Sequence, residues 1–155
     1  MTERSVEHGT FAVERTYDAS PARAFAAWAD PAAKAQWFGP PDEQPDEYEL
    51  DFRVGGREFN RGTGPDGETY TLEARYQDIV PEERIVYSYD MHLGDARISV
   101  SLGTVELTPD GEGTRLTYTE QGAYLDGLDS PAQRESGTGG LLDALGEWLA
   151  REAAS

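Results

Sequence analysis

The sequence contains no cysteine, so disulfide bonds, thiolate chemistry and cysteine-ligated metal sites are excluded. Only two histidines are present, His8 and His92, and they lie far apart, with no carboxylate spacing around them that would group metal ligands. The glycine-rich pieces at 62–64 and 137–140 lack the strand-to-helix context of a phosphate-binding or dinucleotide-binding loop. We therefore expect no metal and no cofactor.

Positive charge is scarce in this chain. It has 13 Lys and Arg against 30 Asp and Glu, which gives a formal net charge of -17. An acidic surface of this kind repels phosphate backbones and anionic lipid headgroups, so nucleic-acid and membrane-surface roles are disfavoured. Lysine is used once, at Lys34. The acidity fits either a salt-adapted protein or the ordinary solvated surface of a chain from a GC-rich genome.

Long hydrophobic runs are also missing. No stretch approaches the ~18 apolar residues of a membrane-spanning helix, and Met1–Gly9 is polar, without the apolar centre of a secretion signal. We expect a cytoplasmic protein, with His8 in a flexible tail. At 155 residues the chain fits one domain, 1–155 with its core at about 10–152, which buries roughly 70% of the surface of the unfolded chain.

The spacing of apolar residues predicts the order of the elements. Thr10–Tyr17 alternates as a first strand, and Ser20 and Asp30, each followed by proline, cap two short helices. A proline-rich acidic loop at 40–45 comes next, and six further alternating segments are typical of strands. The apolar phase slips by one residue after Gly103, which predicts a β-bulge there.

A long amphipathic helix ends this order. A capping box with proline at the first helical position, Ser130-Pro131-Ala132-Gln133, precedes it. Its apolar stripe follows helical spacing and consists of Leu141, Leu142, Leu145, Trp148 and Leu149. Short connections between successive strands indicate an antiparallel meander. One curved sheet wrapped around this C-terminal helix is an α+β fold.

Several motifs resemble those of one family, in the same order. Phe11–Pro40 reads FAVERTYDASPARAFAAWADPAAKAQWFGP, with a first strand, a proline-capped aromatic helix, an Asp-Pro break and a WFGP turn. Asp51–Gly56, Pro81–Ile85, Gly113–Leu116 and Gly140–Asp143 follow along the chain. The chain resembles the AHSA1-like (activator of Hsp90 ATPase homologue 1-like) branch of the START-like, or SRPBCC, superfamily. The resemblance implies a helix-grip (Bet v 1-like) fold.

Members of this superfamily include chaperone-associated proteins, polyketide cyclases and aromatases, and carriers of lipids or aromatic ligands. The resemblance implies a cavity between the sheet and the last helix. We expect aromatic and helix residues to line it: Trp28, Trp37, Phe52, Phe59, Tyr76, Tyr87, Tyr89, Tyr118, Leu141, Leu145 and Trp148. Plain core packing would explain any one of them. The tyrosines favour a wet or ligand-occupied space, since buried hydroxyls need partners.

His92 is the one candidate for a catalytic side chain. It alternates with Tyr87 and Tyr89 along one strand, so it belongs to the opposite face. If that face borders the cavity, His92 could act as a general base; if it faces outward, His92 is an ordinary surface histidine. No nucleophile elbow accompanies it.

Three functions remain open at this point. We expect the chain to bind a small hydrophobic or aromatic ligand, lipid-like or polyketide-like, in a role that could be stress-related. The first alternative is a cyclase- or aromatase-type enzyme that acts on a polyketide-like substrate. The second is an interaction module that contacts an Hsp90-type chaperone. Homodimerisation fits the superfamily, but the sequence does not decide it.

Overall fold

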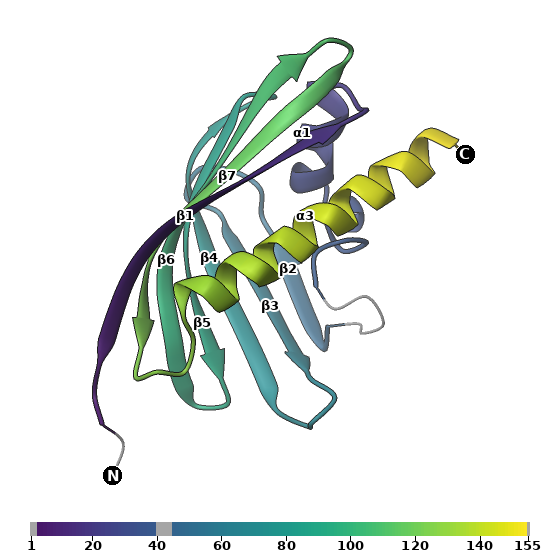
Figure 1. Ribbon diagram of the computed structural model, residues 1–155. Helices are drawn as coiled ribbons and strands as arrows, with labels where there is room; N and C mark the ends of the chain where they lie inside the picture. The colour runs from purple at the N-terminus through teal and green to yellow at the C-terminus, as the bar shows by residue number, and fades with distance from the viewer. Residues whose placement is uncertain (1–2, 40–44, 155) are drawn as a thin grey trace.

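The computed structural model describes residues 3–39 and 45–154 and has the predicted α+β fold. The strands are β1 (Val6–Tyr17), β2 (Glu47–Leu50), β3 (Arg57–Thr63), β4 (Thr69–Val80), β5 (Arg84–Leu93), β6 (Ala96–Asp110) and β7 (Gly113–Leu125). The helices are α1 (Pro21–Ala29), α2 (Pro31–Lys34) and α3 (Pro131–Ala154). One antiparallel sheet, in the order β1-β7-β6-β5-β4-β3-β2, curves around α3 (Figure 1).

The two short helices begin and end at the predicted capping residues. Ser20 is the N-cap of α1 and accepts a hydrogen bond from the backbone N–H of Arg23 at 3.2 Å. Asp30 follows the last residue of α1 and is the N-cap of α2. Its carboxylate accepts a hydrogen bond from the backbone N–H of Ala32 at 3.0 Å. Residues 40–44 of the expected acidic loop lie outside the described residues.

The β-bulge of β6 is not where the apolar pattern predicts it. Beyond Ser99 the strand pairs with β5 without interruption, so the phase does not slip after Gly103 and that prediction is wrong. The register shifts at Ile98, whose two neighbours pair with consecutive residues of β5. Val100 and Leu102 consequently point away from α3 and are 45% and 36% exposed.

Strand β1 is longer than expected. It begins at Val6 and pairs with β7 over its whole length, so His8 lies opposite Ala123 and not in a flexible tail. That expectation is wrong. The additional residues, 6–9, extend the sheet because they pair with residues 122–125 of β7.

The core lies between the concave face of the sheet and α3. This helix packs against β1 and α1, and Leu142, Leu145 and Leu149 of its stripe are buried. Each buried leucine stabilises the fold by about 2 kcal/mol. Leu141 and Trp148 of the same stripe pack against the core and remain partly exposed. Within the described ranges no helix is long and apolar enough to cross a membrane.

Candidate functional site

The concave face of the sheet carries tyrosine rings above small residues. Cross-strand pairing aligns Tyr76 of β4, Tyr87 of β5, Gly103 of β6 and Glu120 of β7 in one row. A Cβ atom on Gly103 would lie 2.8 Å from the hydroxyl oxygen of Tyr118 and 2.9 Å from Cζ of Tyr87. The absence of a side chain at Gly103 therefore makes room for both rings, whose hydroxyl oxygens are 3.1 Å apart.

Glu120 is the centre of a buried hydrogen-bond network. Its side chain is fully buried, and its Oε1 accepts from the hydroxyls of Tyr89 at 2.6 Å and Tyr118 at 2.8 Å. Its Oε2 accepts from the hydroxyl of Tyr124 at 3.0 Å and from Nη1 of Arg134 at 3.1 Å. Four donors thus compensate a carboxylate that would otherwise be costly to bury.

Arg134 joins this network to the first turn of α3. Its Nη1 donates to the Tyr89 hydroxyl at 2.7 Å, and its Nη2 donates to Ser99 Oγ at 2.7 Å and to Asp129 Oδ2 at 2.6 Å. Burial lowers the pKa of Arg134, but Tyr89, Glu120 and Asp129 outweigh that effect and raise the pKa above its ordinary value. A charged guanidinium therefore fixes the start of α3 over the sheet.

The network tyrosines act as hydrogen-bond donors. Burial, and then the charge of Glu120, raises the pKa of Tyr89 well above 10.0. Burial, and then the neighbouring Tyr87, raises the pKa of Tyr118 in the same direction. Phenols of this kind stay protonated at neutral pH, so they can orient a polar group but are poor general bases.

A second buried cluster surrounds the only lysine of the chain. Lys34 is 1% exposed, and its Nζ donates to Glu58 Oε1 at 2.7 Å. The hydroxyl of Tyr76 donates to the same oxygen at 2.8 Å, and that of Tyr48 donates to Oε2 at 3.3 Å. The ring centroid of Phe38 lies 4.4 Å from Nζ, a cation–π distance. This cluster ties α2 to β2, β3 and β4.

Three buried polar atoms have no hydrogen-bond partner in the described parts of the chain: Trp28 Nε1, Asn60 Oδ1 and Ser101 Oγ. Asn60 lies two residues from Glu58 on the same face of β3, and Ser101 pairs with Tyr89 across the sheet. Buried polar groups are almost always paired, by protein or by water. These atoms therefore mark places that a polar ligand group or a water molecule can complete.

Ten of the eleven residues expected to line a cavity belong to the buried core or pack against it. Seven belong to the buried core: Trp28, Trp37, Tyr76, Tyr87, Tyr89, Tyr118 and Leu145. Three pack against the core and stay partly exposed: Phe52, Leu141 and Trp148. Phe59 lies on the other face of β3 from Glu58, under the guanidinium of Arg57 at 4.6 Å, and does not border this space.

His92 does not join the buried network. The preceding Met91 packs against the core, so His92 points to the outer face of β5. There it shares a surface with Asp90, whose carboxylate pairs with Arg97 at 3.2 Å. Across residues 3–39 and 45–154, no three His, Asp or Glu side chains are grouped so that they could hold a metal ion.

The charged members of both clusters were not predicted: Lys34, Glu58, Glu120, Asp129 and Arg134. One of them had a usable signal in the sequence. Leu116 and Tyr118 alternate on the inner face of β7, and two residues further on the same face comes Glu120. No signal in the sequence predicted the burial of Lys34, because its partner Glu58 is 24 residues away and lysine is rarely buried.

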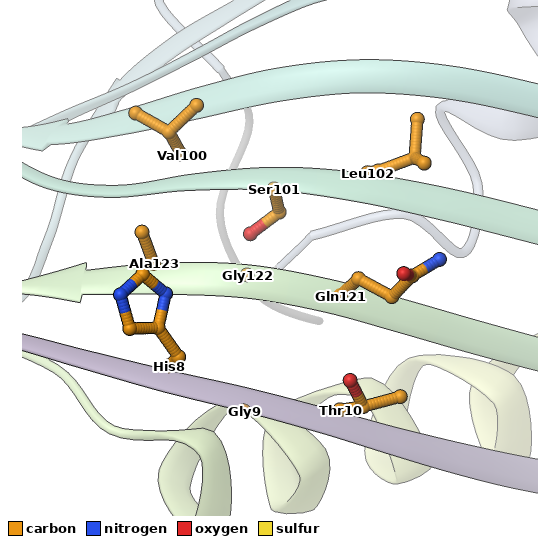
Figure 2. Close-up of a pocket in the computed structure, with 9 residues that line it drawn as sticks. All are labelled: His8, Gly9, Thr10, Val100, Ser101, Leu102, Gln121, Gly122 and Ala123. Carbon is orange, nitrogen blue, oxygen red and sulfur yellow. The ribbon is translucent and has the colours of Figure 1, made fainter.

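Among the described residues, the outer face of the sheet carries two shallow hollows. The larger has a volume of about 440 Å³ and is lined by residues of β1, β6 and β7 (Figure 2). The smaller has a volume of about 220 Å³ and is lined by β4, β5 and β6. Neither includes a residue of α3, so neither is the cavity that the sequence led us to expect between the sheet and the helix.

The curved sheet, the gripped helix and the polar interior define a helix-grip domain of the START-like class. The model of the family described as "Activator of Hsp90 ATPase homolog 1-like protein" matches residues 18–150. The chain belongs to this AHSA1 family.

Solved structures of relatives support the assignment. A protein of Rhizobium leguminosarum is 45% identical, with a TM-score of 0.93 over 97% of this chain and 99% of that one. A protein of Rhizobium loti is 53% identical, with a TM-score of 0.87 over 93% and 99%. A protein of Chromobacterium violaceum is 26% identical, with a TM-score of 0.71 over 89% and 95%. Comparison with curated proteins gives no match.

Proposed function

We propose that this protein binds a small hydrophobic or aromatic molecule, lipid-like or polyketide-like, in the cytoplasm and does not convert it. We place the binding site between the concave face of β2–β5 and α3. The carrying observation is a set of apolar side chains that pack against the core and stay partly exposed: Phe25, Phe38, Leu50, Phe52, Leu72, Met91, Leu141 and Trp148. A ligand that covers such side chains gains free energy from their burial.

The size of this apolar surface sets the expected affinity. A two-ring ligand that removes about 400 Å² of apolar surface from water, counting both partners, gains ~10 kcal/mol. Loss of translational and rotational freedom costs at least ~4 kcal/mol of this. The remaining ~6 kcal/mol corresponds to a Kd of tens of micromolar.

The polar atoms at the same face favour a particular kind of ligand. Within the described ranges Asn60 Oδ1 is an acceptor without a partner, and Asn60 pairs across the sheet with the half-buried Leu72. A ligand hydroxyl or N–H aimed at this oxygen would remove a penalty of about 1–3 kcal/mol. A carboxylate is disfavoured there, because Glu58 lies on the same face and the chain is strongly acidic.

Fluorescence titration with N-phenyl-1-naphthylamine, an uncharged aromatic probe, tests this proposal. We expect saturable binding by the native protein and roughly tenfold weaker binding by Leu72→Gln, whose polar end interrupts the apolar surface. Leu128→Gln is the matched control, since Leu128 is 46% exposed in the connection before α3. Absence of saturable binding, or equal weakening in both variants, would contradict the proposal.

The two alternatives have less support. A cyclase- or aromatase-type enzyme would need a proton acceptor that is free to reach the substrate. His92 faces outward, and the carboxylates of Glu58 and Glu120 already accept from buried donors of the protein. A chaperone-associated, stress-linked role draws on the description of the family alone. Recovery of an Hsp90-type ATPase in a pull-down with the native protein, and not with a charge-matched control domain, would be needed to favour that role.

A further inference from the structure

The middle of α3 has three glycines at the four positions 137–140. Each glycine lowers the local stability of a helix about fivefold relative to alanine. At Gly137 and Gly140 an added Cβ would meet nothing within 4 Å among the described residues. At Gly139 it would meet only the end of the flexible Arg15 side chain, at 3.2 Å. Packing therefore does not require glycine at these three positions.

Gly146, further along the same helix, is different. A Cβ there would lie 3.0 Å from Cε1 of the Tyr17 ring, so the close contact between α3 and β1 leaves little room for a side chain. The hydroxyl of Tyr17 also donates to the carbonyl of Leu142 at 2.7 Å. The glycine in the C-terminal half thus permits close packing, whereas those at 137–140 weaken the middle of α3.

Contacts on both sides of this weak segment hold α3 in place. Before it, Arg134 donates to Ser99 of β6 at 2.7 Å and to Glu120 of β7 at 3.1 Å. After it, Leu149 is buried, and its carbonyl accepts from Nη2 of Arg23 on α1 at 2.9 Å. A helix that is fixed on both sides of a weak segment can bend or unwind there while both attachments remain.

We propose that residues 137–140 are a hinge, at which α3 opens to admit the ligand to the site between the sheet and the helix. The inference rests on the proposed function. Because α3 crosses the concave side of the sheet (Figure 1), it covers the proposed site. Leu141 directly follows the glycines and is one of the partly exposed side chains that the ligand would contact. Unwinding at 137–140 moves Leu141, while Arg134 and Leu149 keep α3 attached.

Hydrogen exchange of the full native chain tests the hinge without a ligand. Unwinding at 137–140 breaks the helical bonds of amides 137–144, because each amide bonds four residues back. We expect these amides to exchange about tenfold faster than those of 145–149. In the double variant Gly137→Ala/Gly140→Ala their exchange should slow by about tenfold or more. Equal protection along 137–149 in the native protein, or unchanged exchange in the double variant, would overturn the hinge.

Binding kinetics test what the hinge does. Stopped-flow mixing with N-phenyl-1-naphthylamine gives the association and dissociation rates of this probe. We expect the double variant to slow both rates by about tenfold, with Kd nearly unchanged, because fewer molecules are open at any moment. Glu147→Ala places an alanine at an exposed position of α3 outside the hinge, and it should leave both rates as in the native protein.

The hinge and the proposed function fail in different ways. Absence of saturable probe binding by the native protein would overturn the proposed function and the admission of a ligand with it, while hydrogen exchange still decides whether 137–140 opens. Saturable binding with equal rates in the native protein and the double variant, although exchange at 137–144 has slowed, would overturn the role of the hinge in ligand entry. The proposed function would then stand without it.

Discussion

Glu120 is the residue on which most of the buried network depends. Its four donors come from three elements, namely Tyr89 on β5, Tyr118 and Tyr124 on β7, and Arg134 on α3. Because each donor is buried, loss of this acceptor would leave several polar groups without a partner at once. The carboxylate therefore holds the start of α3 against the sheet as well as filling the core.

Replacing this carboxylate by an amide should be costly. Glu120→Gln keeps the shape but brings N–H donors into a place already supplied with donors, and leaves Arg134 with Asp129 as its nearby charge. We expect the free energy of unfolding in urea to fall by about 3 kcal/mol. Glu106→Gln, at an exposed position of β6, should change it by less than about 0.5 kcal/mol. A loss below about 1 kcal/mol for Glu120→Gln would contradict this role.

At the scale of elements, two glycines should respond to alanine in opposite directions. In β6, Gly103→Ala places a Cβ against the rings of Tyr87 and Tyr118, which are held by neighbours, so we expect a loss of about 1–3 kcal/mol in unfolding free energy. In α3, Gly137 is exposed with nothing within 4 Å of the added Cβ, and Gly137→Ala should gain about 0.5–1 kcal/mol. Thermal unfolding of both variants checks the signs. A stabilising Gly103→Ala would show that the rings have more room than their contacts indicate.

Helices and strands could be predicted where their signals lie in neighbouring residues, as helix caps and alternating apolar residues do. The caps at Ser20 and Asp30 predicted where both short helices begin, and the alternation of apolar residues predicted the strand β5. The bulge of β6 was misplaced because the pattern counted Val100 and Leu102 as core, although both lie on the outer face. Apolar residues on a surface look the same in a sequence as apolar residues in a core.

The buried charges were beyond a local rule. Lys34 and Glu58 become a pair only when α2 packs on β3, and Arg134 meets Glu120 only when α3 crosses the sheet. Their burial depends on tertiary contacts, whereas their residue types are those most often exposed. The network could therefore be found in the structure and, apart from the phase of Glu120, not from the sequence.

At the scale of the whole molecule, one part of the interior is a network of charged and polar side chains, and the other part is apolar. The network of Glu120 and Arg134 fixes the N-terminal turn of α3, and Leu142, Leu145 and Leu149 hold the helix further along. Among the half-buried apolar residues, Leu50 and Leu72 belong to β2 and β4, which lie towards the end of the sheet away from β1 (Figure 1). A ligand at that side would be covered by apolar groups while the polar network stays intact.

The tyrosine-rich interior predicts a loss of stability in alkali. Burial is the first cause that raises the pKa of seven tyrosines above 10.0: Tyr17, Tyr48, Tyr76, Tyr87, Tyr89, Tyr118 and Tyr124. The folded state then keeps protons that the unfolded state releases, so their contribution is complete below pH ~10 and is lost as pH rises above it. We expect Tm to fall steeply there, with tyrosinate absorbance appearing together with unfolding. Tyrosinate absorbance at full strength in the folded protein would contradict this.

The three tryptophans allow the most direct test of ligand binding between the sheet and α3. Trp28 and Trp37 are buried in the core, whereas Trp148 is partly exposed beside the proposed site. The test is a two-dimensional ¹H–¹⁵N NMR titration with N-phenyl-1-naphthylamine. We expect the indole N–H signal of Trp148 to shift. The signal of Trp37 should stay in place, because its indole N–H donates to the Ala27 carbonyl at 3.1 Å. Shifts confined to outer-face amides near Val100, with the Trp148 signal unmoved, would contradict binding in the interior.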